Sequence, residues 1–167
     1  MQKNILSFFL LSAVAIAKAP PPLTVTADQM TYNDKTKIST AIGKAVATFH
    51  NADGKQMLYA DSMTAHHNTD NMNSVHTLHA KSPPNKQVFF QSPTLTITAT
   101  TCRYDGKAQN IFCSGCVKVS DLKKKDTITG DTAKINIETN VYGVESSNEH
   151  LSEAILHTGS PTAENKA

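Results

Sequence analysis

The residues whose spacing is closest to that of a reactive site are Cys113 and Cys116, which form a CxxC pair. In a thiol oxidoreductase such a pair stands at a helix N-terminus, which lowers the thiol pKa. The residues around this pair alternate as in a strand, so redox catalysis is not expected. Cys102 and Cys113 flank the turn at Asp105 at similar distances, and a cross-strand disulfide between them is an alternative in an oxidising compartment. One of the three cysteines is then left unpaired.

The seven histidines include the neighbours His66 and His67 and the pair His76 and His79. A spacing of three on a strand places the two rings of the second pair on opposite faces. Zinc sites need three or four convergent ligands. We therefore expect exposed polar positions, with no metal site and no cofactor.

No catalytic motif stands out in the chain. The GxSxG, HExxH, P-loop and dinucleotide fingerprints are absent from the sequence, and we expect no enzymatic activity. The recurring Asp28, Asp61 and Asp131 resemble candidate acids, but each lies where the strand pattern bends, so a turn role is expected. The chain has 16 basic and 14 acidic residues and one arginine, Arg103, which argues against a nucleic-acid partner.

The N-terminal segment predicts export. Lys3 supplies a positive charge, an apolar run follows from Ile5 to Ala17, and a small-x-small pattern ends at Ala17. We expect a signal peptide at 1–17 that is cleaved after Ala17, followed by a proline-rich lead-in at 18–22. The alternative is an uncleaved membrane anchor, although the run is shorter than the roughly 20 residues that a spanning helix needs.

A tandem repeat organises the remainder of the chain. The sequence LTVTA at 23–27 matches LTITA at 95–99, an offset of 72 residues from Leu23 to Leu95. The same offset pairs two tyrosines, two lysines and two glycines further along. A finer echo relates ADQMT at 27–31 to ADSMT at 60–64. Such repeats stack and share one continuous core.

Each repeat predicts strands. Apolar and polar residues alternate with a period of two, threonine and valine are frequent, and Asn-Asp, Asp-Gly and Thr-Asn steps separate the runs. The alternation changes phase after Ala27 and again after Ala99. A phase change at the same place in both repeats predicts a bend or bulge at Asp28 and Thr100.

These residues carry a family resemblance. The run TADQMTY at 26–32, the turn NDKT at 33–36, a strand that ends near Gly43 and the return TGDTA at 129–133 resemble the periplasmic OstA-like, or LptA, family. The resemblance covers 23–147, leaving 148–167 as a C-terminal tail. It implies an all-β fold, a twisted, V-shaped and open β-jellyroll of about 12–16 antiparallel strands.

The resemblance also implies a function. Such a protein is located in the periplasm and carries lipopolysaccharide between the inner and outer membranes, with the lipid A acyl chains in an apolar groove. It joins end to end by β-strand pairing, both with copies of itself and with inner-membrane (LptC-like) and outer-membrane (LptD-like) components that have OstA-like domains. The alternatives are a membrane-anchored, LptC-like relative and a structural β-assembly protein without lipid cargo.

The expected groove residues are the larger apolar side chains that alternate toward one face. Flexible methionine side chains among them suit a surface that accepts variable acyl chains. The set is Val25, Met30, Tyr32, Ile42, Phe49, Met57, Tyr59, Met63, Leu95, Ile97, Tyr104, Ile111, Val117, Val119, Ile128, Ile135 and Ile137. A closed core would need the same pattern, so groove and core both stay open at this point.

Overall fold

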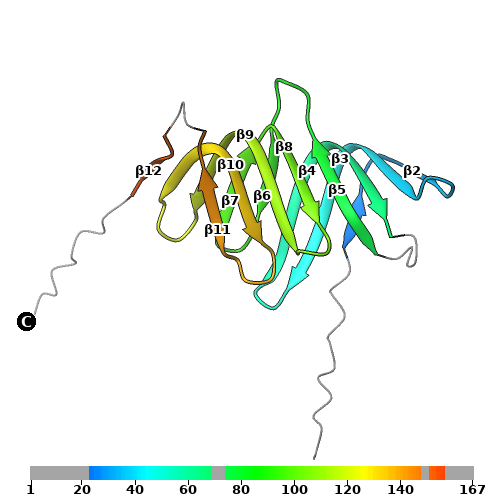
Figure 1. Cartoon of the computed structure of the whole chain (residues 1–167), viewed down its shortest axis with the longest axis horizontal. Helices are drawn as coiled ribbons and strands as arrows, with labels where there is room; N and C mark the ends of the chain where they lie inside the picture. Colours follow the sequence, from blue (N-terminus) through cyan, green and yellow to red (C-terminus); the bar gives the residue numbers. More distant parts are fainter. Residues whose placement is uncertain (1–22, 69–73, 148–150, 157–167) are drawn as a thin grey trace, which may run out of the picture.

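The computed structural model describes residues 23–68, 74–147 and 151–156, which form an antiparallel sheet of 12 strands and no helix (Figure 1). The expected all-β class is confirmed. The strands are β1 (Thr24–Thr26), β2 (Gln29–Asn33), β3 (Ile38–Asn51), β4 (Gly54–His67), β5 (Val75–Lys81), β6 (Val88–Gln91), β7 (Leu95–Ala99), β8 (Thr101–Asp105), β9 (Asn110–Asp121), β10 (Thr127–Asn136), β11 (Tyr142–Glu145) and β12 (Glu153–Ile155).

Three expectations fall outside the described residues: the signal peptide at 1–17, the lead-in at 18–22 and much of the tail. Where the structure does describe the chain, it has no helix of the length and hydrophobicity that crossing a membrane requires. β12 lies within the segment expected as a tail, because alternation over three residues is too short to recognise in a sequence.

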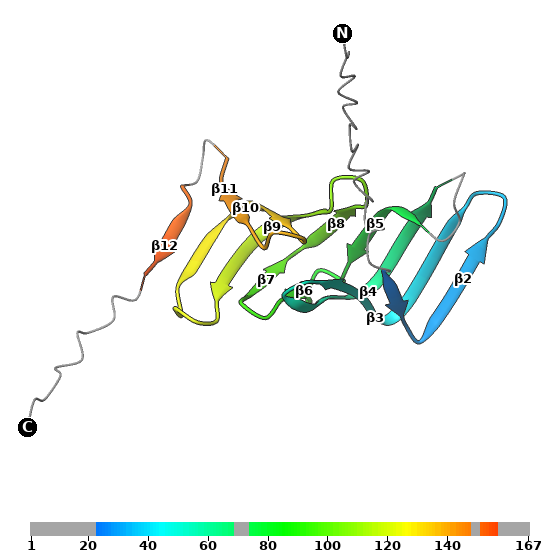
Figure 2. The same ribbon diagram turned by 90° about the horizontal axis from the view of Figure 1, so that it is seen from below.

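Four long strands divide the sheet into two layers. The first half of β3 pairs with β2 and its second half with β1. β4 likewise pairs with β5 and β6, β9 with β8 and β7, and β10 with β11 and β12. The first layer therefore holds β2, β5, β8 and β11, and the second holds β1, β6, β7 and β12. Figure 2 shows β5 and β8 on one side of the molecule and β6 and β7 on the other. This is the expected twisted β-jellyroll.

The two repeats change layer in the same way. The backbone N–H of Asp28 donates to the carbonyl of Gly43 over 2.8 Å, and that of Thr100 donates to the carbonyl of Gly115 over 2.9 Å. Both glycines have a positive φ, 79° and 82°, which an L side chain rarely adopts. The predicted bends at Asp28 and Thr100 are confirmed. We call this edge, where the chain passes from one layer to the other, the fold line.

The turns after β2 and β8 are also repeated. The Asn33 side-chain oxygen accepts the N–H groups of Lys35 and Thr36, and that of Asp105 accepts those of Lys107 and Ala108. The two hydrogen bonds to Asp105, of which that from the Ala108 N–H contributes most, lower the pKa of its carboxyl. Such Asx turns are the local reason why each strand ends where it does.

The long edge opposite the fold line is closed by side chains. Asn51 of the second layer donates to the carbonyl of Ile137 over 2.6 Å, and Gln56 donates to the same carbonyl over 3.1 Å. Gln56 also donates to Asn140 over 2.7 Å, and Asn140 donates to Asp53 over 2.5 Å. We call these five residues the latch. They join the β3–β4 turn to the loop after β10, so they bridge the two layers.

Both ends of the molecule expose strand edges. β1 and β2 pair only with β3 among the described strands, and β11 and β12 pair only with β10. Figure 1 shows β2 at one extreme of the long axis and β12 at the other. The sheet is thus open at its two ends, with unpaired backbone groups on each.

Candidate functional site

The inner face of the first layer is formed by rows of residues that run from end to end of the molecule. Along a row each residue is the register partner of the next. One row is Met30, Ala41, Met63, Ala80, Cys102, Cys113, Ala133 and Val144. The adjacent row is Tyr32, Ser39, Ala65, Leu78, Tyr104, Ile111, Ile135 and Tyr142. Side chains in these rows alternate with outward polar residues, as the period of two requires.

The second layer faces them with a row of its own. This row consists of Val25, Ala47, Leu58, Phe90, Ile97, Val119, Ile128 and Ala154. Phe49 and Tyr104 meet between the layers with ring centroids 4.9 Å apart, and burial raises the pKa of the Tyr104 hydroxyl. The three rows make a continuous apolar interior from β1 and β2 to β11, and the second-layer row ends at the exposed Ala154 of β12.

The middle of this interior is packed. Leu58, Leu78, Phe90 and Ile111 are fully buried, and many of the positions between them are alanine. Cys102 and Cys113, the candidate pair of the sequence analysis, are register partners and form a disulfide that faces the interior. Cys116 is free and exposed. Small alanine side chains let the two layers approach closely, so the interior is a thin apolar seam.

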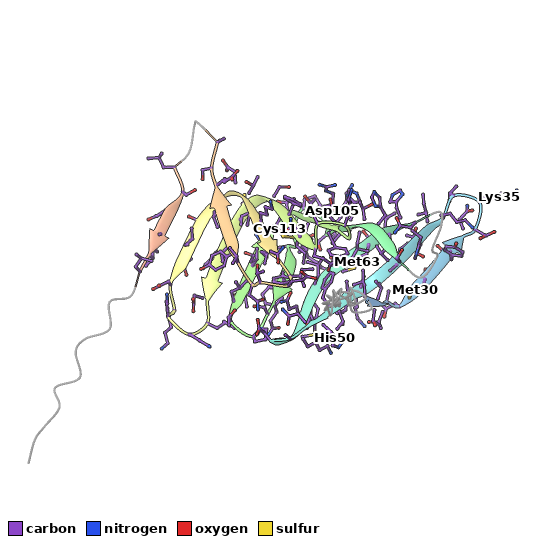
Figure 3. All side chains as sticks on the ribbon, turned by 60° about the horizontal axis from the view of Figure 1, so that its bottom comes forward. Met30, Lys35, His50, Met63, Asp105 and Cys113 are labelled. Carbon is purple, nitrogen blue, oxygen red and sulfur yellow. A yellow bond between two sulfur atoms is a disulfide. The ribbon has the colours of Figure 1, made fainter. Side chains whose placement is uncertain are left out.

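The seam opens at the end formed by β1 and β2. A cavity of about 180 Å³ lies there between the layers. It is lined by Leu23, Val25, Met30, Ser39, Ala41, Met63, Ala65, His67, Val75 and Leu78. Met30 is 53% exposed and Tyr32 45% exposed, while Met63 is buried. In Figure 3 Met30 lies between Met63 and the tip that carries Lys35, so the cavity is the mouth of the seam.

Polar groups border this mouth. The Ser39 hydroxyl and His67 Nε2 are 2.7 Å apart, and the Tyr32 and His67 rings meet edge to face at 5.6 Å. No group of three or more histidine, cysteine, aspartate or glutamate side chains capable of holding a metal occurs in the part of the chain that the structure describes. The mouth therefore offers apolar walls with a hydroxyl, a phenol and an imidazole at the rim.

Most of the expected groove residues lie in or beside the seam. Buried ones are Phe49, Met63, Leu95, Ile97, Tyr104, Ile111, Val117, Val119, Ile135 and Ile137. Val25 and Ile128 are half-buried members of the second-layer row. The structure thus gathers on one interior surface residues that are spread over most of the sequence.

Three expected groove residues point the other way. Ile42 is 52% exposed and pairs with Ser62 on the outer face of the first layer. Met57 and Tyr59 alternate with the buried Leu58 and lie on the outer face of the second layer, where the Tyr59 ring packs on Phe89. These assignments were wrong because the larger apolar side chain was chosen, although the alternation places the neighbouring alanine or leucine on the inner face.

Sequence reasoning also missed several interior residues. Ala41, Leu58, Leu78 and Phe90 are buried members of the rows, and their positions in the alternation could have identified them. Gln56 is fully buried, and its Oε1 has no hydrogen-bond partner. Its role in the latch depends on residues more than eighty positions away, so no local signal predicts it.

A sequence profile of the family described as LptA/(LptD N-terminal domain) LPS transport protein matches residues 24–141. This range contains β1 to β10 and therefore both repeats. No curated protein sequence matches the chain significantly.

Among solved structures, the fold is similar to the crystal structure of LptH, the LptA-homologous periplasmic component of the lipopolysaccharide transport device of Pseudomonas aeruginosa. The TM-score is 0.65 with 13% sequence identity, and the match covers 83% of this chain and 96% of that one. At this identity the likeness establishes the fold.

Proposed function

Because the chain belongs to the family of LptA and LptD N-terminal domain lipopolysaccharide transport proteins, we propose that it is a periplasmic carrier that holds acyl chains in the seam. It is not an enzyme in this proposal. The apolar interior that runs unbroken between the two ends carries the proposal. A lipid moving along it would keep its acyl chains out of water, and each buried Å² is worth about 25 cal/mol.

The mouth at β1 and β2 is the proposed entry. Its 180 Å³ accommodates the end of one acyl chain, and a whole chain would need the two layers to part. The layers are continuous along the fold line and are held at the opposite edge by the latch. Parting would therefore open that edge and break few hydrogen bonds.

The ends support end-to-end assembly. Met30, Tyr32 and Ile42 are exposed near one end, and Val141, Leu151 and Ile155 near the other. Unpaired strand edges flanked by apolar side chains pair readily with another strand, which is β-augmentation. We propose head-to-tail joining of this chain with copies of itself and with inner-membrane and outer-membrane components that have like domains.

Photo-crosslinking in living cells tests the transport proposal. A photoreactive residue at Met63 or at Ile137 should capture lipopolysaccharide, because both side chains face the seam. Met57 is the matched control, since it is a methionine on the same strand whose side chain lies on the outer face of the second layer. Equal capture from Met63 and Met57, or capture from neither inner position, would overturn the proposal.

A structural β-assembly protein without cargo is the second candidate. The packed middle of the seam favours it, because a scaffold needs no open interior. The same crosslinking experiment separates the two functions. The membrane-anchored alternative depends on residues 1–17, so N-terminal sequencing of the mature protein decides it: we expect Lys18 as the first residue.

A further inference from the structure

The outer face of the first layer carries a row of register partners whose charge changes along its length. Along the register it consists of Thr31, Thr40, Thr64, His79, Arg103, Phe112, Lys134 and Gly143. Toward the second repeat the threonines give way to His79, Arg103 and Lys134 around one aromatic ring. This replaces a neutral surface by a positively charged one.

This surface is concave. A hollow of about 980 Å³ lies over β5, β8, β9, β10 and β11 and is lined by His79, Lys81, Arg103, Phe112 and Lys134 among others. Arg103 and Lys134 are exposed, and Phe112 is half-buried. A volume of this size accommodates a small ligand or a headgroup. A flat membrane surface would not reach its floor.

Between described residues, the two ion pairs join Lys37 to Asp34 and Lys86 to Asp61, so no cation of the hollow is in an ion pair. Asp105 follows Arg103 by two residues on β8, and the Arg103 charge acts on its carboxyl after the N–H groups of Ala108 and Lys107 in lowering its pKa. Glu145 is the carboxylate that lines the hollow, and it lies on β11. Clustering like charges costs free energy in the unliganded protein, so the cluster favours an anionic ligand.

Phe112 fixes the spacing of the two strongest cations. The Arg103 guanidinium carbon and the Lys134 ammonium nitrogen each lie 5.4 Å from the centre of its ring. The three residues are register partners on β8, β9 and β10. The backbones of Arg103 and Lys134 are two strand spacings apart, about 10 Å. Two cations on the strands that flank β9 in one hollow can each contact a different anionic group of the same ligand.

The positive charges in and around the hollow also act on His79. Its imidazole neighbours Arg103 across the strands. Partial burial, followed by the charges of Arg103, His66 and Lys81, lowers its pKa. The hollow is therefore an electropositive and partly desolvated place, in which an anion is bound more strongly than on an open surface.

We infer that this hollow, around Arg103, Phe112 and Lys134, binds a multiply phosphorylated saccharide on the outside of the protein, away from the seam. The choice of ligand rests on the proposed function, because a phosphorylated headgroup is the anionic part of the proposed cargo. The site itself rests on the charge and shape of the hollow. The anion could belong to the lipid that occupies the seam or to a separate molecule.

Calorimetric titration of the exported protein tests the site. The probe is the oligosaccharide obtained by complete deacylation of lipopolysaccharide, with the same oligosaccharide after removal of its phosphates, and with inorganic phosphate, as comparisons. We expect the phosphorylated oligosaccharide to bind. The double variant Arg103→Gln/Lys134→Gln should weaken it at least tenfold, because two charge-assisted contacts are lost. Arg103→Lys keeps the positive charge, so this single variant should lose less affinity than the double variant.

Lys118→Gln is the matched control. Lys118 is an exposed lysine on the second-layer part of β9, so this substitution removes one positive charge outside the hollow, against two inside it in the double variant. The inference is overturned if the phosphorylated oligosaccharide does not bind, if its phosphates are dispensable, or if Lys118→Gln weakens binding as much as the double variant. Binding of anionic phospholipid vesicles without binding of the oligosaccharide overturns it too.

Crosslinking of intact lipopolysaccharide at Met63 in the double variant identifies the source of the anion. A reduced yield assigns the bound headgroup to the lipid in the seam, and an unchanged yield assigns it to a separate molecule. The two proposals also fail separately. Capture of lipopolysaccharide at Met63 without oligosaccharide binding would overturn the outer site and leave the transport function standing. Oligosaccharide binding without capture at Met63 would overturn the transport function alone.

Discussion

Gly115 lies so close to Thr100 that a Cβ on the glycine would stand 2.5 Å from the threonine hydroxyl oxygen. The same relationship joins Gly43 to the Asp28 carboxylate in the first repeat, at 2.6 Å. Both glycines accept the hydrogen bond that starts the next strand. The fold line therefore requires a residue without a side chain at the same place in each repeat.

Gly115→Ala should lower the free energy of unfolding by about 1–3 kcal/mol, because alanine is strained at a φ of 82° and meets Thr100. Urea denaturation followed by circular dichroism measures the change. Gly143→Ala is the control, since a Cβ there has nothing within 4 Å. Equal stability of the two variants would show that the close approach at the fold line has no energetic consequence.

Ile97→Asp should destabilise the protein by several kcal/mol and abolish lipid capture, because it buries an unpaired carboxylate in a seam position that is 1% exposed. Thr98→Asp should be mild. Thr98 lies on the outer face and its register partner on β9 is Lys118, which can pair with the new charge. Thermal unfolding compares the two. Similar losses would mean that the register of β7 is shifted by one residue.

The latch gives a prediction about opening. Asn140→Gly removes the side chain that links Gln56 to Asp53 and is compatible with the φ of 54° at this position. Two hydrogen bonds across the edge opposite the fold line are lost, so the free energy of unfolding should fall by about 1–3 kcal/mol. Hydrogen exchange in the seam should accelerate, and acyl-chain capture at Met63 should increase.

Asn85→Gly is the control for this variant, because Asn85 is exposed in the turn between β5 and β6, far from the latch in the sequence. It should leave exchange and capture unchanged. If Asn140→Gly loses stability without any rise in capture, the latch is a structural tie that does not limit access to the seam.

The architecture was predictable because its signals are local or repeated. The period of two identified strands, and the offset between Leu23 and Leu95 identified the duplication. The phase change at Asp28 and Thr100 marked the fold line, since a bulge inserts a residue into the alternation. These features depend on neighbours in the sequence, and the structure confirms them.

The site was less predictable because its residues are selected by position. Alanines such as Ala41 and Ala47 take inner positions of the seam, while the larger Ile42, Met57 and Tyr59 cover outer faces. Tyr59 also donates to the Met57 sulfur over 3.1 Å, which gives these two side chains a local partner outside the seam. The contacts of Gln56 with Ile137 and Asn140 join distant segments, and only the fold brings them together.

The histidine in the outer hollow gives a pH prediction. The pKa of His79 is lowered from its ordinary 6.5. Burial is the largest cause, followed by the charges of Arg103, His66 and Lys81. Between the two pKa values the folded state binds fewer protons than the unfolded state. The contribution of His79 to stability is therefore complete above pH 6.5 and is lost as the pH falls from there toward the folded-state pKa.

Nuclear magnetic resonance of the imidazole measures this pKa directly. Arg103→Gln should raise the pKa of His79 toward 6.5, because the nearest positive charge is removed. Lys118→Gln should leave it unchanged. A pKa of His79 that is insensitive to Arg103 would place the two side chains too far apart to share the hollow.

The last prediction concerns assembly, which in the proposed function joins the β1–β2 end of one molecule to the β11–β12 end of the next. Such a contact uses two different surfaces, so it propagates into rods and does not close with two molecules. We expect the sedimentation coefficient to rise continuously with protein concentration. Removal of 142–167 takes away β11 and β12, leaves β10 as the edge and should leave a monomer that no longer captures its outer-membrane partner. Removal of 164–167 alone should have no effect, because this polar segment has no strand pattern. If the chain stays monomeric at every concentration, and the longer truncation still captures the partner, pairing of strand edges is not how this protein assembles.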